Sequence, residues 1–93
     1  MAALYVQVTR QLLSACVLIR TSHGKFEDAV ESIRQLKPVK RVFPTLGRYD
    51  AVVDLETADI KELDATVLRL GCIAGVVFTE TLVEIKQGEA KTC

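Results

Sequence analysis

Two segments of the chain resemble each other. One begins at position 15, and the other begins 36 positions later, at position 51. Each segment begins with a short apolar run that is typical of a strand, and each continues through a threonine to a lysine. The matched pairs are Ala15/Ala51, Val17/Val53, Ile19/Leu55, Thr21/Thr57 and Lys25/Lys61. Because similar sequences form similar units, this repeat predicts a fold with two equivalent halves.

Hydrophobic spacing and turn signals divide the chain into six elements. They are strands at 15–19, 39–46, 51–56 and 76–85 and amphipathic helices at 26–36 and 60–70. Pro38 ends the first helix, and Asp59 is the expected N-cap of the second, with Glu62 reaching back to it. Pro44 cannot donate a ladder hydrogen bond, so its strand belongs at a sheet edge. The order βαββαβ predicts an α+β, ferredoxin-like sandwich whose first and third strands are central.

Both faces of the predicted central strands are apolar. Val17 and Ile19 point to one side while Cys16 and Leu18 point to the other. Two helices cover only one face of such a sheet, and a monomer rarely leaves several hundred Å² of apolar surface in water. Burying about 500 Å² supplies about 12 kcal/mol before association costs. We therefore expect two copies to pair through their sheets, the alternative being that residues 1–12 fold back over the open face.

Composition argues against several other classes of protein. The chain carries 12 basic and 12 acidic residues in 93, whereas nucleic-acid-binding domains are usually basic. Lys37, Lys40 and Arg41 indicate protection of an edge strand. The longest apolar run, 71–78, is far shorter than a membrane span, and no signal peptide is evident. We expect a soluble cytoplasmic protein that has no membrane contact.

No catalytic or metal-binding motif is visible. The three cysteines form no CxxC pair, so a zinc cluster is not expected. The single histidine, His23, precedes a glycine in a predicted turn and is expected to be a solvated turn residue. We therefore expect a protein that is not an enzyme and has no cofactor.

Two polar motifs are candidates for a binding site. The connection 45–50 contains Gly47, Tyr49 and Asp50, although such a segment is often no more than a hairpin turn. Thr79 and Thr81 share one face of the last strand, where threonine is also an ordinary strand former.

Because of the order and spacing of its motifs, the segment 16–85 resembles the effector-binding domain of the Lrp/AsnC (feast/famine) transcription regulators. The shared pattern is Val17-Leu18-Ile19-Arg20-Thr21 with Gly24-Lys25, Pro38-Val39 with Val42, Gly47-x-Tyr49-Asp50 with Val52-Val53, and Gly75-Val76 with Thr79-x-Thr81. The resemblance implies a dimeric α/β barrel that assembles into an octamer or decamer. It also implies an amino-acid effector in clefts between dimers, with these effector-binding residues: Gly47, Arg48, Tyr49, Asp50, Thr79 and Thr81.

The resemblance predicts a stand-alone amino-acid-sensing module. Family regulators place a helix-turn-helix before this domain, and only about 12 residues precede it here, so we expect no direct DNA binding. Its partners are then further copies of itself and full-length Lrp/AsnC regulators, or an amino-acid enzyme that it serves as an ACT-like subunit. Alternatives are a small dimeric α/β-barrel enzyme, monooxygenase- or isomerase-like, and a purely structural role. The expected division is an extension or extra strand at 1–12, the ligand-binding domain at 13–86 and a flexible tail at 87–93.

Overall fold

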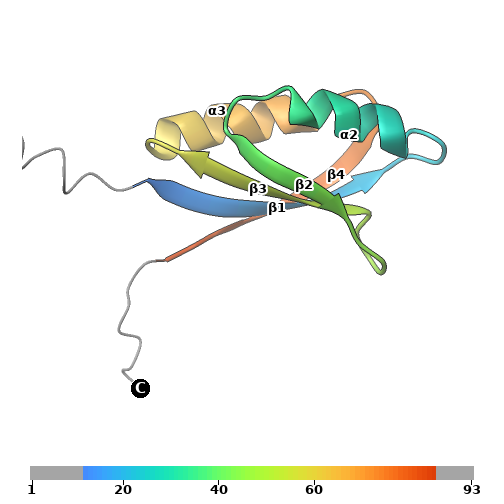
Figure 1. Ribbon diagram of the computed structural model, residues 1–93, viewed down its shortest axis with the longest axis horizontal. Coiled ribbons are helices and arrows are strands. Elements are labelled where there is room, and N and C mark those ends of the chain that lie inside the picture. Colours follow the sequence, from blue (N-terminus) through green and yellow to red (C-terminus); the bar gives the residue numbers. More distant parts are fainter. Residues whose placement is uncertain (1–11, 86–93) are drawn as a thin grey trace, which may run out of the picture.

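The predicted βαββαβ order is confirmed by the computed structural model, which describes residues 12–85 (Figure 1). The elements are β1 (Leu13–Thr21), α2 (Phe26–Arg34), β2 (Val39–Pro44), β3 (Ala51–Thr57), α3 (Ile60–Gly71) and β4 (Val76–Val83). Apart from Leu12, the predicted N-terminal extension lies outside the described residues, and so does the predicted tail at 87–93.

The four strands form one antiparallel sheet in the order β2-β3-β1-β4. As expected, β1 and β3 are central, and β2, which contains Pro44, is an edge strand. Val17 pairs with Val53 on one side and with Thr81 on the other. Both helices lie on one side of the sheet, called here the helix face (Figure 1).

The core lies between the helices and alternate residues of the central strands. Along β3 every second side chain is buried, and β1 alternates in the same way at Ala15, Val17 and Ile19. The helices contribute the following buried residues: Ala29, Ile33, Leu63, Thr66 and Leu70. Ile60, the first residue of α3, is 60% exposed.

The start of α3 differs in one detail from the expected capping box. Asp59 caps the helix as predicted, since its Oδ1 accepts a hydrogen bond from the Glu62 amide at 2.9 Å. The Glu62 carboxylate, however, accepts from the amide of Ala58 at 2.7 Å rather than from that of Asp59. Asp59 has an extended backbone, so the amide one residue earlier is within reach of the side chain.

The side of the sheet opposite the helices has no covering element among the described residues (Figure 1). We call this side the open face and define it by Cys16, Leu18, Phe43, Val52, Asp54 and Leu82, which stand at the positions alternating with the buried ones. Leu82 is 51% exposed there, and Phe78 is 48% exposed. On the open face the middle of the central strands is thus apolar at Leu18 and Val52, while Ser14, Asp54 and Glu56 make the end near the start of β1 polar. Within residues 12–85 neither helix combines the length and hydropathy needed to cross a bilayer.

Candidate functional site

The connection between β2 and β3 is a tight turn closed by its own hydrogen bonds. The Thr45 amide donates to the Asp50 carbonyl at 3.0 Å, and the Thr45 hydroxyl donates to the Tyr49 carbonyl at 2.8 Å. Gly47 has a φ of +126°, which a residue with a side chain rarely adopts. Gly47 and its neighbour Arg48 form the exposed tip, while Tyr49 and Asp50 are half-buried.

Asp50 attaches this turn to the end of β1. Its Oδ2 accepts hydrogen bonds from the Thr21 amide at 2.7 Å and from the Thr21 hydroxyl at 3.3 Å. The Asp50 amide in turn donates to the Ile19 carbonyl at 2.8 Å. The carboxylate is therefore held in place by β1.

A pocket of about 580 Å³ opens beside Asp50, where β1 ends and β3 begins. We call it the end pocket; its main lining residues are Thr21, Ser22, His23, Phe26, Thr45 and Asp50. One carboxylate, three hydroxyls, an imidazole and a phenyl ring suit a small molecule that carries an amine and an apolar side chain. Of the six residues predicted from the sequence, only Asp50 lines this pocket. Thr21 was missed as a site residue although it belongs to the repeated strand pattern, because its contact with Asp50 depends on strand register.

Tyr49 points away from Asp50 and reaches the opposite edge of the sheet. Its ring stacks on Phe78, with centroids 6.3 Å apart, and its hydroxyl donates to the Glu80 carboxylate at 2.5 Å. This hydrogen bond is the main reason that the pKa of Tyr49 is raised above its ordinary value. Phe78 pairs with Arg20 and Glu80 with Leu18, so Tyr49 lies over the open face.

Thr79 and Thr81 lie on the helix face of β4, where they pair with Ile19 and Val17 and are half-buried. Within one chain, the six predicted residues therefore occupy different places. Asp50 is in the end pocket, Tyr49 is over the open face, Gly47 and Arg48 are at the turn tip, and the two threonines are on the helix face.

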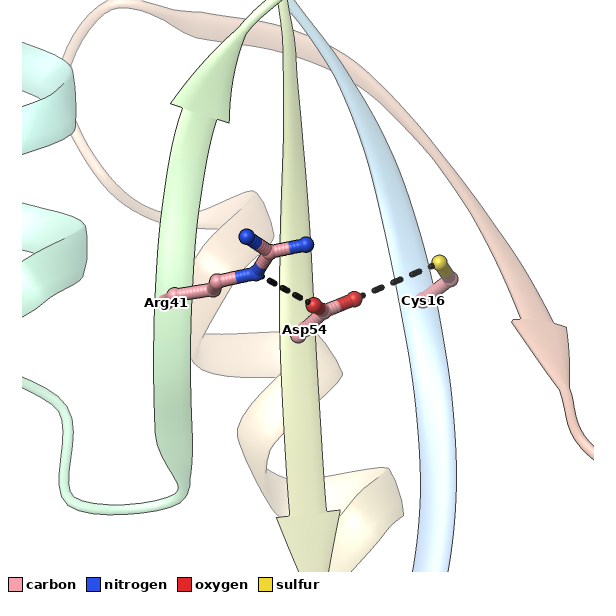
Figure 2. A network of polar contacts seen from close by, with 3 residues as sticks. All are labelled: Cys16, Arg41 and Asp54. Atoms are coloured by element: carbon pink, nitrogen blue, oxygen red, sulfur yellow. Dashed lines mark hydrogen bonds and ion pairs between the residues drawn. The ribbon is translucent and has the colours of Figure 1, made fainter.

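A polar cluster that the sequence reading did not single out crosses the open face (Figure 2). Arg41 Nε donates to Asp54 Oδ2 at 2.9 Å, and Cys16 Sγ donates to Asp54 Oδ1 at 3.6 Å. Burial, followed by the charge of Asp54, raises the pKa of the Cys16 thiol, which favours the less nucleophilic protonated form. The one available signal was Asp54, a charged residue between the apolar Val53 and Leu55 in the predicted strand 51–56.

A second pair, Lys40 and Glu56, lies 3.3 Å apart beside this cluster. The basic group that the sequence placed on an edge strand is therefore partly neutralised by carboxylates of β3. A groove of about 580 Å³ follows the cluster toward β4. Among residues 12–85 there is no group of three or more His, Cys, Asp or Glu side chains that could hold a metal ion.

A sheet with helices on one face, a bare opposite face and a polar pocket at one end defines a small α+β domain suited to binding and association. The family model described as the Lrp/AsnC ligand binding domain matches residues 14–90. The chain therefore belongs to the Lrp/AsnC family, as its motifs suggested.

Individual relatives agree with this assignment. The HTH-type transcriptional regulator FL11 of Pyrococcus abyssi is 30% identical over 78 residues, which cover 84% of this chain and 52% of the regulator. The chain thus spans about half the length of the regulators that it matches. Among solved structures, TTHA0845 from Thermus thermophilus is 33% identical with a TM-score of 0.76, covering 80% of this chain and 94% of that one. The regulator NMB0573 of Neisseria meningitidis, solved in complex with L-Met, shares the fold at 21% identity and a TM-score of 0.77, covering 92% and 58%.

Proposed function

We propose that the chain is an amino-acid-sensing regulatory module that assembles through its open face and does not itself bind DNA. The observation that carries the proposal is the Asp50 carboxylate, held by Thr21 at the edge of a polar pocket in a domain of a ligand-binding family. A carboxylate with neighbouring hydroxyls is a suitable partner for the ammonium group of an amino acid.

The proposed binding mode uses the oxygen of Asp50 that β1 leaves available. Both hydrogen bonds from Thr21 go to Oδ2, so Oδ1 can accept from the ligand ammonium. Phe26 offers an apolar surface for the side chain of the ligand. The amides near Gly47, with Arg48 beside them, are proposed for the ligand carboxylate, although within one chain these residues lie at the turn tip outside the pocket. Because Ile19 pairs with both Ala51 and Thr79, the threonines of β4 lie two strands from Asp50. Thr79, Thr81 and Tyr49 belong to the proposed site only if a cleft between assembled copies brings them to the same ligand.

The proposed assembly begins with two copies that pair through their open faces, which gives a dimeric α/β barrel. Further association of dimers into an octamer or decamer then forms the clefts between dimers. Leu82, which is 51% exposed, and Phe78, which is 48% exposed beside the Tyr49 ring, support an apolar contact.

The proposed partner on DNA is a full-length regulator of the same family. The relative FL11 is named as an HTH-type regulator, and this chain matches about half of it. Both described helices pack on the sheet, and the formal charge of the chain is balanced. We propose that the module acts by entering mixed assemblies with regulators that supply the DNA-binding part. The alternatives, an ACT-like subunit of an amino-acid enzyme or a small barrel enzyme, have no specific observation in their favour.

A screen of the twenty amino acids by thermal shift and calorimetry tests the proposal. L-methionine is a sensible first ligand, since one protein of the same fold was solved with it. A ligand at about 100 times its dissociation constant stabilises the folded state by about 2.7 kcal/mol, which is an easily measured shift. We expect at least one amino acid to bind the wild-type chain and to lose affinity in Asp50→Asn. If none of the twenty binds at about 10 mM, a concentration at which even millimolar affinity is detected, the sensing role is wrong.

A further inference from the structure

One row of side chains crosses the open face from edge to edge. It runs from Arg41 on β2 through Asp54 on β3 and Cys16 on β1 to Leu82 on β4. The groove on this face follows the row, and Lys40 and Glu84 also line it. The cationic side chains of the groove thus come from one edge strand, and Glu84 comes from the end of the other.

Arg41 is held in position but is only partly satisfied. Its guanidinium carbon lies 4.6 Å from the centroid of the Phe43 ring, and its Nε is taken by Asp54. None of the described residues accepts a hydrogen bond from its terminal Nη1 or Nη2 groups. Asp54, in contrast, uses both oxygens, one for Arg41 and one for Cys16. If the open face is covered, the guanidinium therefore needs an acceptor, because a buried charged donor without one is costly.

Glu84 is the carboxylate on this face best placed to accept from another chain. Among residues 12–85 it has no ion-pair partner, whereas Glu80 already accepts from Tyr49. Two strands separate β2 from β4, which places them about 14 Å apart, so Glu84 cannot reach Arg41 of its own chain. The acceptor and the donor can meet only between chains.

If the strands of the two sheets run along the same line, two-fold symmetry allows two ways to stack the open faces. If the axis runs across the strands, β2 faces β2 and β4 faces β4, so like charges meet. If the axis runs along the strands, the order β2-β3-β1-β4 is reversed in the second copy, and β2 lies over the other β4. Arg41 then lies over Leu82 of the second copy, beside its Glu84.

We propose that the open face takes a second copy of this chain in the latter alignment, with Arg41 of each copy paired to Glu84 of the other. This inference rests on the proposed pairing of sheets and adds the residues that select the partner. In a partner chain that carries a cation in place of Glu84, this cation would lie against the Arg41 guanidinium and repel it. The charge pair therefore selects between partner chains whose apolar faces are similar.

Two single charge reversals and their mixture test the proposal. Arg41→Glu and Glu84→Arg each oppose like charges in their own homodimer, so we expect the dimer dissociation constant to rise roughly tenfold or more. In the heterodimer of the two variants, one of the two contacts pairs the introduced Glu with the introduced Arg and the other pairs the native Arg41 with the native Glu84. Mixing them should therefore restore association, seen by native mass spectrometry as a species with one chain of each mass. Lys37→Glu, a reversal at a residue outside the groove, is the control and should leave association unchanged.

The outcomes separate this inference from the proposed function. A dimeric wild type whose reversals do not weaken association, or whose mixture is not restored, overturns the pairing of Arg41 with Glu84 alone. A wild type that is monomeric at micromolar concentration overturns the proposed assembly and this inference with it. Circular dichroism checks that each variant is folded. Because Arg41→Glu adds charge beside Asp54, the double variant Arg41→Glu/Asp54→Asn replaces it in the mixture if the single variant does not fold.

Discussion

The Tyr49 hydroxyl donates a hydrogen bond to the Glu80 carboxylate at 2.5 Å, so the β2–β3 turn is bound to the far edge strand of the sheet. The next residue, Asp50, is bound to Thr21 at the end of β1. Consecutive residues of one turn therefore contact two different strands from opposite directions. The turn therefore connects the proposed ligand site with the open face, where the sheets are proposed to pair.

The contact between Tyr49 and Glu80 predicts how the phenol titrates. The hydrogen bond raises the pKa of Tyr49, since ionisation would leave a phenolate against a carboxylate. We expect Glu80→Gln to lower this pKa toward the ordinary tyrosine value of about 10. The measurement is the absorbance titration of the wild type, from which the titration of Tyr49→Phe is subtracted. The difference reports Tyr49 alone, because the second tyrosine, Tyr5, contributes equally to both curves.

The same shift makes stability fall at alkaline pH. A raised folded-state pKa means that the unfolded state binds fewer protons above about pH 10, so the free energy of unfolding decreases as pH rises from there through the folded-state pKa. Below this window the contribution of the hydrogen bond is complete. We expect the alkaline loss to be smaller in Tyr49→Phe than in wild type. Equal pH profiles for the two proteins would contradict the contact.

Asp50→Asn should weaken amino-acid binding by about 1.5–3 kcal/mol, the scale of a hydrogen bond to a charged group. The substitution removes the charge but keeps a carbonyl oxygen for the Thr21 amide, so the fold should survive. Asp50→Ala should bind as weakly and also be less stable, because it leaves that amide without its acceptor. The exposed Asp64→Asn on α3 is the matched control for calorimetry. Equal affinity in wild type and Asp50→Asn would remove Asp50 from the site.

Association through the open face predicts different effects for two leucines. Leu82 is 51% exposed on that face and Leu68 is 70% exposed on α3. In solution we expect the wild type to be at least a dimer and Leu82→Glu to associate roughly 100-fold more weakly, since an unpaired charge buried in the contact costs about 3 kcal/mol. Leu68→Glu should associate like wild type. Light scattering and sedimentation equilibrium measure both, and a wild-type mass of one chain at micromolar concentration would rule out the pairing.

The order of the elements was predictable because it depends on local patterns. Alternating burial in β1 and β3 follows the repeated positions around Val17 and Val53, and Pro44 on an edge strand follows from its missing amide hydrogen. The limits of β1 were less predictable, since Ser14 and Thr21 are polar and are included only because they pair with neighbouring strands. That pairing depends on residues that lie far apart in the sequence, so a local pattern does not reveal it.

The candidate site was predictable only in part for the same reason. The motif around Gly47 and Asp50 indicated the turn, and the structure places Asp50 in a pocket. The direction of Tyr49, the contact of Asp50 with Thr21 and the cluster around Asp54 depend on register between strands, which a single sequence does not reveal.

Gly75 should be less tolerant of substitution than Gly24. Both have positive φ, +97° and +78°, so alanine is strained by about 1 kcal/mol at either position. A Cβ on Gly75 would also lie 2.9 Å from Lys25 Cβ, whereas a Cβ on Gly24 meets nothing within 4 Å. We expect Gly75→Ala to lose about 1–3 kcal/mol more than Gly24→Ala in urea unfolding. Equal losses would show that the packing of Gly75 on Lys25 is looser than described.

The final prediction is that the purified chain shows no sequence-specific DNA binding at physiological salt. The formal charge of the chain is zero, and two members of its basic group are paired, Lys40 with Glu56 and Arg41 with Asp54. Weak association through Lys37, Lys40 and Arg41 is expected only at low salt, and it should disappear as counterions screen these charges. Gel shifts at about 150 mM salt, the physiological ionic strength, with a promoter fragment and a scrambled control measure this. A shift that depends on sequence, given by this chain alone, would contradict the proposed dependence on a full-length regulator.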